Sequence, residues 1–144
     1  MTNWSLPKRV DLADITVRDG FQHEEKWIPT EAKLWVLEEL VLAGYRRLEV
    51  TNLGNPKGMP QFRDSDELLK GIRSSKRVEK QIAGVEMTAV TIREKAVDRA
   101  IEASVDFLLS RDPAIADYPM GYGNSKPNGS WFRLGFPSGY VTDV

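Results

Sequence analysis

The chain has 144 residues, 41% of them hydrophobic and 28% charged, which is the composition of a globular protein with one domain-sized core. Its 20 Lys and Arg residues are balanced by 21 Asp and Glu residues, and the net charge of -1 argues against nucleic acid or an anionic membrane as a partner. It has no Cys and one His, which excludes disulfides, thiolate chemistry and a multi-histidine zinc site.

Short apolar runs alternate with segments of helical period from Val10 to Leu109. The predicted strands cover residues 10–17, 48–51, 81–87 and 105–109. Three helical segments separate them. This alternation indicates an α/β fold built from parallel β-α-β units.

The helices are predicted from their boundary signals. These signals are, in chain order, Thr30 as the first cap with Gly44 as the left-handed end, Asp64 with Glu67, and Thr91 with Glu94. The apolar residues expected to face the core are Leu34, Leu37, Leu40 and Val41, then Leu68, Leu69 and Ile72, then Ala96, Val97, Ala100 and Ile101.

The pattern stops after Ser110, where Pro and Gly residues interleave and neither period continues. We expect residues 1–110 to form the folded domain and residues 111–144 to be an irregular tail rich in Gly, Pro and aromatic residues. The tail is expected to be a functional loop, a disordered segment, or foreign to the fold, and these interpretations stay open. Its aromatic side chains can pack on an exposed sheet edge, they can stack on a ligand, or the tail is foreign to the fold through truncation or an altered reading frame.

Polar residues follow the first strand and occupy the second. In parallel α/β folds, the loops after the strands build the active site, so Arg18, Asp19 and Glu49 are candidates for chemistry. A carboxylate can bind a hard cation, an arginine can neutralise an enolate, and Glu49 can hold the guanidinium in place. The alternative is an ordinary Asp-Gly turn beside a solvated Arg18 and a strand-end glutamate.

Three segments of the chain carry a resemblance to a known family. They are Val-Arg-Asp-Gly-Phe-Gln-His-Glu at 17–24, Ile-Pro-Thr-Glu-Ala-Lys at 28–33, and Leu-Glu-Val-Thr-Asn-Leu-Gly-Asn-Pro-Lys-Gly-Met-Pro-Gln at 48–61. In this order they resemble the opening third of the 3-hydroxy-3-methylglutaryl-CoA lyases. These belong to the metallolyases and Claisen-type synthases that share an Asp-Arg-Glu constellation on a TIM barrel, the pyruvate carboxyltransferase domain superfamily. Pro56 to Gln61 favours the lyase branch, and the resemblance spans roughly residues 8–110.

The resemblance implies a fold and site roles. The fold would be a partial TIM (β/α)8 barrel of about the first four β/α units, since a complete barrel takes ~250 residues. Asp19 would bind Mg²⁺ or Mn²⁺, Arg18 would steady the substrate carbonyl and the enolate, and Glu49 would orient that arginine. Gln22 would lie close to the substrate. The implied reaction is retro-Claisen cleavage that gives acetyl-CoA.

Departures from the family limit this expectation. The family's His-x-His pair, an Asn ligand and a catalytic Cys come from later in the chain, and this sequence offers only His23 and no Cys. We therefore expect any divalent metal to bind weakly. His23 itself is expected to be a solvated loop residue. Lys57 is a candidate for a CoA phosphate, with a solvated surface lysine as the alternative.

Three functional hypotheses follow from these observations. The preferred one is a truncated lyase that acts on an acyl-CoA and is inactive as this chain alone. The second is a non-catalytic half-barrel that binds an acyl-CoA or forms homo-oligomers through its open sheet edges. The third is a Claisen-type synthase or aldolase of the same superfamily. No membrane-length apolar run, secretory signal or transit peptide is recognisable, and we expect a cytoplasmic protein.

Overall fold

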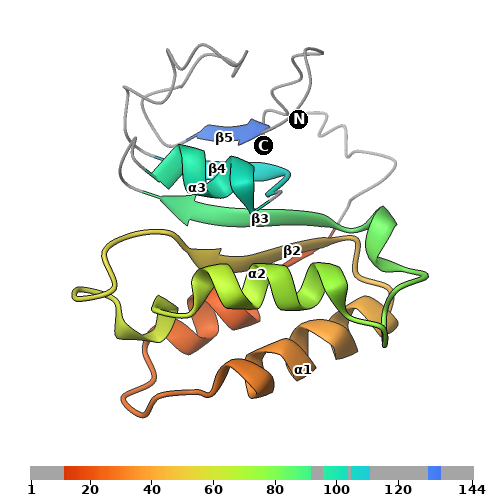
Figure 1. Ribbon diagram of the computed structural model, residues 1–144, viewed down its shortest axis with the longest axis horizontal. Coiled ribbons are helices and arrows are strands. Elements are labelled where there is room, and N and C mark those ends of the chain that lie inside the picture. The colour runs from red at the N-terminus through yellow and green to blue at the C-terminus, as the bar shows by residue number, and fades with distance from the viewer. Residues whose placement is uncertain (1–11, 92–95, 104, 111–129, 134–144) are drawn as a thin grey trace, which may run out of the picture.

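The computed structural model describes residues 12–91, 96–103, 105–110 and 130–133 (Figure 1). They form one sheet with the strand order β1-β2-β3-β4-β5. The strands are β1 (Ala13–Asp14), β2 (Arg47–Asn52), β3 (Glu86–Thr91), β4 (Phe107–Ser110) and β5 (Ser130–Arg133). β1 to β4 pair parallel and in chain order, whereas β5 pairs antiparallel with β4. The expected α/β architecture with a parallel sheet is confirmed, and the described sheet does not close into a barrel.

Helical segments connect the parallel strands. They are the π-helical turn η1 (Thr16–Gly20), α1 (Thr30–Leu42), the 3-10 turn η2 (Pro60–Phe62), α2 (Ser65–Ser74), the 3-10 turn η3 (Ile82–Gly84) and α3 (Ala96–Glu102). In Figure 1, α1 and α2 lie side by side along the β1–β2 part of the sheet, and α3 lies against the β3–β4 part. Within the described ranges, no helix is long and apolar enough to cross a membrane.

The core lies between the sheet and these helices, and most of the predicted core residues belong to it. Leu37 and Val41 of α1 are buried, as are Leu68, Leu69 and Ile72 of α2. They pack with buried strand residues of β2 and β3, namely Leu48, Val50, Met87 and Ala89. Burial of such apolar area is the main stabilising contribution to a domain of this size.

The first strand is much shorter than predicted. Within the described residues it covers only Ala13–Asp14, and Val17, expected in the strand, lies in η1. The Asp14 carboxylate explains the early end, because its Oδ1 accepts a hydrogen bond from the Thr16 amide at 2.9 Å and its Oδ2 one from the Thr16 hydroxyl at 3.1 Å. Such local side-chain bonds turn the backbone out of the extended conformation.

The third strand begins later than predicted. Residues 81–85 wind through η3, in which the amides of Gln81 and Ile82 both donate to the Val78 carbonyl. An apolar run this short is compatible with either a strand or a helical turn, and this explains the error. Thr91, the predicted cap of the third helix, is the last, buried residue of β3 and pairs with Ser110. Its expected partner Glu94 lies outside the described residues.

The two remaining caps also differ from expectation, while the end of α1 is confirmed. Gly44 has a φ of +97°, the left-handed conformation predicted for it. Thr30 does not cap α1, since Pro29 is the N-cap. Asp64 is the N-cap residue of α2, as predicted, but its carboxylate accepts no hydrogen bond from a helix amide and instead binds Thr30 and Lys33. A buried ammonium group requires a paired carboxylate more strongly than a helix end requires a cap.

Four residues of the expected irregular tail form a strand. β5 (Ser130–Arg133) runs antiparallel along β4, with Phe107 opposite Arg133 and Ser110 opposite Ser130. It therefore occupies the sheet edge at which a parallel barrel would add its next strand. The rest of the predicted tail, residues 111–129 and 134–144, lies outside the described residues.

Candidate functional site

The structure brings together four of the five predicted site residues. The Arg18 guanidinium, in η1, donates from Nε to Glu49 Oε1 on the neighbouring strand β2. Its Nη1 donates to Asp19 Oδ1 at 2.7 Å and, more weakly, to Gln22 Oε1 at 3.4 Å. The interpretation of Arg18 as a freely solvated charge is therefore wrong.

Burial and charge differ across this cluster. The Glu49 side chain is 3% exposed and that of Arg18 is 16% exposed, whereas Asp19 is 47% exposed. Burial raises the pKa of Glu49 above its ordinary value of 4.5, and the hydrogen bond and positive charge of Arg18 oppose that rise. The ion pair thus holds the guanidinium at a fixed place beside solvent, where it can neutralise an anionic oxygen.

Asp19 is the group through which this cluster can meet a cation. Its carboxylate is exposed enough to offer an oxygen that Arg18 does not occupy. Within the described ranges, however, no three His, Cys, Asp or Glu side chains converge on a point where a metal ion could be held. The described acidic and histidine side chains therefore do not make up a metal site by themselves.

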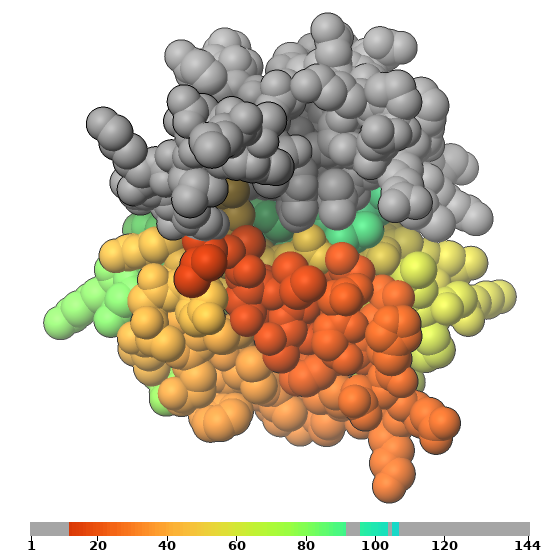
Figure 2. Space-filling model, turned by 180° about the vertical axis from the view of Figure 1, so that it is seen from behind, coloured from red at the N-terminus to blue at the C-terminus, as the bar shows by residue number. Residues whose placement is uncertain are grey.

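Lys57 and His23, the other loop residues considered from the sequence, form no hydrogen bond with this cluster among the described contacts. Lys57 is exposed in the loop after β2, where its amide donates to Asn55 Oδ1 at 3.0 Å. His23 is exposed, which confirms the expectation of a solvated loop histidine. Figure 2 shows that the red and orange residues of the segment around β1 and η1 reach the surface of the molecule on its rear face.

A second polar cluster was missed by the sequence reasoning. Lys33, only 1% exposed, donates to both Asp64 oxygens at 2.9 and 3.1 Å and to the Gln61 carbonyl oxygen. Its ammonium also lies 3.9 Å from the centre of the Trp27 ring, and the Arg63 guanidinium lies 3.7 Å from the same centre. A sequence signal existed, since Lys33 precedes Leu37 and Val41 at helical spacing on the buried stripe of α1.

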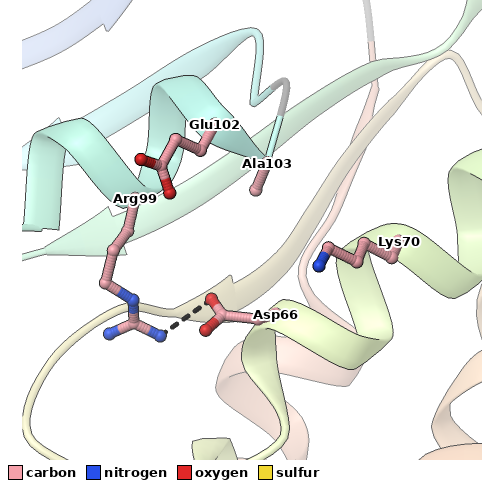
Figure 3. Close-up of a pocket in the computed structure, with 5 residues that line it drawn as sticks. All are labelled: Asp66, Lys70, Arg99, Glu102 and Ala103. Atoms are coloured by element: carbon pink, nitrogen blue, oxygen red, sulfur yellow. Dashed lines mark hydrogen bonds and ion pairs between the residues drawn. The ribbon is translucent and has the colours of Figure 1, made fainter.

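A hollow of about 220 Å³ lies on another part of the molecule (Figure 3). It is lined by Asp66 and Lys70 of α2 and by Arg99, Glu102 and Ala103 at α3. Arg99 and Asp66 are paired across it at 2.8 Å, and the two acidic and two basic side chains balance. None of the predicted site residues lines this hollow, so we place the candidate site at Arg18 and Glu49.

Comparisons with known proteins show what the chain is similar to. No protein family model matches the chain. The hydroxymethylglutaryl-CoA lyase of Bacillus subtilis is 31% identical over 100 residues, which are 69% of this chain and 31% of that enzyme. The crystal structure of the HMG-CoA lyase from Brucella melitensis superposes with a TM-score of 0.62 at 30% identity, over 71% of this chain and 34% of that one.

This chain is homologous to the N-terminal part of the HMG-CoA lyases. The family resemblance seen in the three sequence segments is thereby confirmed. The chain spans about a third of the length of these HMG-CoA lyases. A further HMG-CoA lyase structure, from Acinetobacter baumannii, is described as a complex with coenzyme A and 3-methylmalate; it matches 67% of this chain at 28% identity with a TM-score of 0.58.

Proposed function

We propose that this chain carries the arginine-carboxylate part of a metal-dependent carbon-carbon lyase site that cleaves a 3-hydroxy-3-methyl acyl-CoA to acetyl-CoA. The observation that carries the proposal is the fixed Arg18 guanidinium, held by buried Glu49 and flanked by exposed Asp19. It supplies a preorganised cation where a retro-Claisen reaction develops an enolate oxygen. The homology to HMG-CoA lyases supports the substrate class.

Each residue has a distinct role in this proposal. Arg18 binds the thioester carbonyl and stabilises the enolate that forms as the carbon-carbon bond breaks. Glu49 is a positioning residue that fixes the guanidinium, and Gln22 contributes a polar group beside the substrate. Asp19 is one oxygen ligand of Mg²⁺ or Mn²⁺, whose role when bound would be to polarise substrate oxygens. Lys57 is proposed to bind a CoA phosphate. The protein is proposed to act in the cytoplasm.

Turnover needs more than the described residues provide. Because the described acidic and histidine side chains do not make up a metal site by themselves and the chain has no Cys, we expect no acetyl-CoA release from purified 144-residue protein with Mn²⁺ and 3-hydroxy-3-methylglutaryl-CoA. The assay is run beside Arg18→Gln. Release that the Arg18→Gln substitution abolishes would show a complete site and overturn the expected inactivity. Release that persists in the variant would contradict the role of Arg18.

Two other functions are alternatives to the lyase, and similar experiments distinguish them from it. A Claisen-type synthase would condense acetyl-CoA with a 2-oxo acid in the presence of Mn²⁺, and this is measured as release of free CoA. A non-catalytic half-barrel would bind an acyl-CoA without dependence on Arg18, or would self-associate. The place of the Arg18 guanidinium between Glu49 and Asp19, together with the homology to HMG-CoA lyases, supports the lyase proposal over simple binding.

A further inference from the structure

The Gln61 side chain connects the segments that follow the two elements of the candidate site, η1 and β2. Gln61 is 4% exposed, and its side-chain amide forms hydrogen bonds with the backbone of the loop after η1. Its Nε2 donates to the carbonyl oxygens of Glu24 at 2.8 Å and Lys26 at 2.6 Å, and its Oε1 accepts from the Ile28 amide at 3.2 Å. One side chain therefore fixes alternate residues of segment 24–28.

This segment follows directly on the residues of the candidate site. Glu24 comes two residues after Gln22, and its amide donates to the Phe21 carbonyl at 3.2 Å, so the fixed segment is continuous with the helical turn that bears Arg18. Gln61 itself lies in η2, in the connection that follows β2 and thus Glu49. The side chain thus joins the segment that continues from Arg18 to the connection that continues from Glu49.

Gln61 is itself held firmly. Its carbonyl oxygen accepts a hydrogen bond from Lys33 Nζ, and the same ammonium binds Asp64 at the start of α2. Trp27, in the fixed segment, lies against Lys33 and Arg63. Since α1, η2 and the segment share these contacts, Gln61 has a defined position from which to fix the loop.

We propose that Gln61 is a positioning residue of the candidate site: by bracing segment 24–28, it sets the placement of the Arg18 guanidinium against Glu49. The inference rests on the proposed function in one respect, that Arg18 and Glu49 form the site. Its test reads geometry and needs no substrate, so a failure of acyl-CoA binding would not be mistaken for a failure of the brace.

The test compares Gln61→Glu with Gln81→Glu, which makes the same chemical change at an exposed position. Glutamate keeps the shape of Gln61 but replaces its donor by an oxygen, which repels the carbonyl oxygens of Glu24 and Lys26 and should push the segment, with the Ile28 amide, away. Hydrogen exchange by NMR follows the Ile28 amide and the Arg18 Nε–H. We expect both protons to exchange at least roughly tenfold faster in Gln61→Glu and to be unchanged in Gln81→Glu.

Two results would overturn the proposal. Faster exchange at Ile28 with an unchanged Arg18 Nε–H would show that Gln61 shapes only its loop, and unchanged exchange at Ile28 would show no brace. If Gln61→Glu does not fold, the unsubstituted protein is measured in low denaturant. The Ile28 amide and the Arg18 Nε–H are then expected to exchange through one shared opening, with equal opening free energies and equal denaturant dependence. Separate openings would contradict the inference.

Discussion

Glu49 is the most buried member of the candidate site, and its charge has a cost that depends on pH. Because burial raises its pKa above 4.5, the folded state binds a proton at Glu49 more readily than the unfolded state does. The stability that this proton contributes is fully present below pH 4.5. It is lost as the pH rises through the folded-state pKa.

This gives a prediction for Glu49→Gln, which removes the titrating group and keeps an acceptor for Arg18. We expect the unfolding free energy of the unsubstituted protein to fall relative to that of Glu49→Gln as the pH rises from 4.5. Urea unfolding of both proteins across this range measures the difference. A difference that moves in favour of the unsubstituted protein with rising pH would mean that the Arg18 ion pair outweighs burial.

Lys33 provides a second prediction at the residue scale. Lys33→Met removes the cation that pairs with Asp64, whose side chain is 6% exposed, and should cost about 3–5 kcal/mol because a buried carboxylate loses its partner. Lys80→Met, at an exposed position, is the matched control and should change stability by less than about 0.5 kcal/mol. Urea unfolding at pH 7 measures both, and equal effects would refute the buried pair.

The candidate site was predictable where its residues carry a local signal. Arg18, Asp19 and Glu49 stand at or after strand residues in the order that a parallel fold demands, and the expected contact between Arg18 and Glu49 is present. The Gln61 and Lys33 contacts were not predictable. They join residues 28 to 37 positions apart, and no local pattern records which distant backbone groups a buried side chain will meet.

At the scale of elements, the end of α1 offers the cleanest test. A Cβ at Gly44 would meet no atom within 4 Å, so the φ of +97° is the sole obstacle to a side chain there. We expect Gly44→Ala to destabilise the protein by about 1–2 kcal/mol. Gly58→Ala is the control, since its Cβ would make only an ordinary contact with the Asn55 carbonyl oxygen at 3.7 Å.

Thermal or urea unfolding measures both glycine variants, and the control should change the unfolding free energy by less than about 0.5 kcal/mol. An equal loss in the two would show that α1 does not depend on the left-handed residue. The presence of the helices and their buried faces were predictable, because the spacing of apolar residues reflects burial directly. The element boundaries were harder to predict, because hydrogen bonds of the Asp14 and Asp64 side chains changed the strand end and the helix cap.

At the scale of the whole molecule, the two edges of the described sheet differ. β5 covers the β4 edge, whereas β1 pairs on one side only, with β2. Leu12, 70% exposed, and Ile15, 45% exposed, flank β1. An open edge beside exposed apolar side chains favours association with another chain.

We therefore predict that the purified protein self-associates, and that Leu12→Lys with Ile15→Lys weakens the association at least roughly tenfold. Light scattering after size-exclusion chromatography, over a range of protein concentrations, measures the mass. Trp35→Lys, on the outer face of α1 and also exposed, tests whether any apolar side chain serves as well. A monomer of 16.3 kDa at all concentrations would contradict the prediction.

The parallel order of β1 to β4 was predictable, since a chain that alternates strand and helix segments can adopt only a few topologies. β5 was not predictable, because the sequence between β4 and β5 is rich in Pro and Gly and shows no strand or helix period.

We propose above all that Arg18, fixed by Glu49, recognises the acyl part of a CoA thioester.

Isothermal titration calorimetry with 3-hydroxy-3-methylglutaryl-CoA and Mn²⁺ tests it most directly, comparing the unsubstituted protein with Arg18→Gln and with Arg77→Gln, whose exposed arginine bears equal charge. The account predicts that Arg18→Gln weakens binding by roughly tenfold or more, while Arg77→Gln and the affinity for CoA alone are unchanged. Equal affinities of the unsubstituted protein and Arg18→Gln would contradict it.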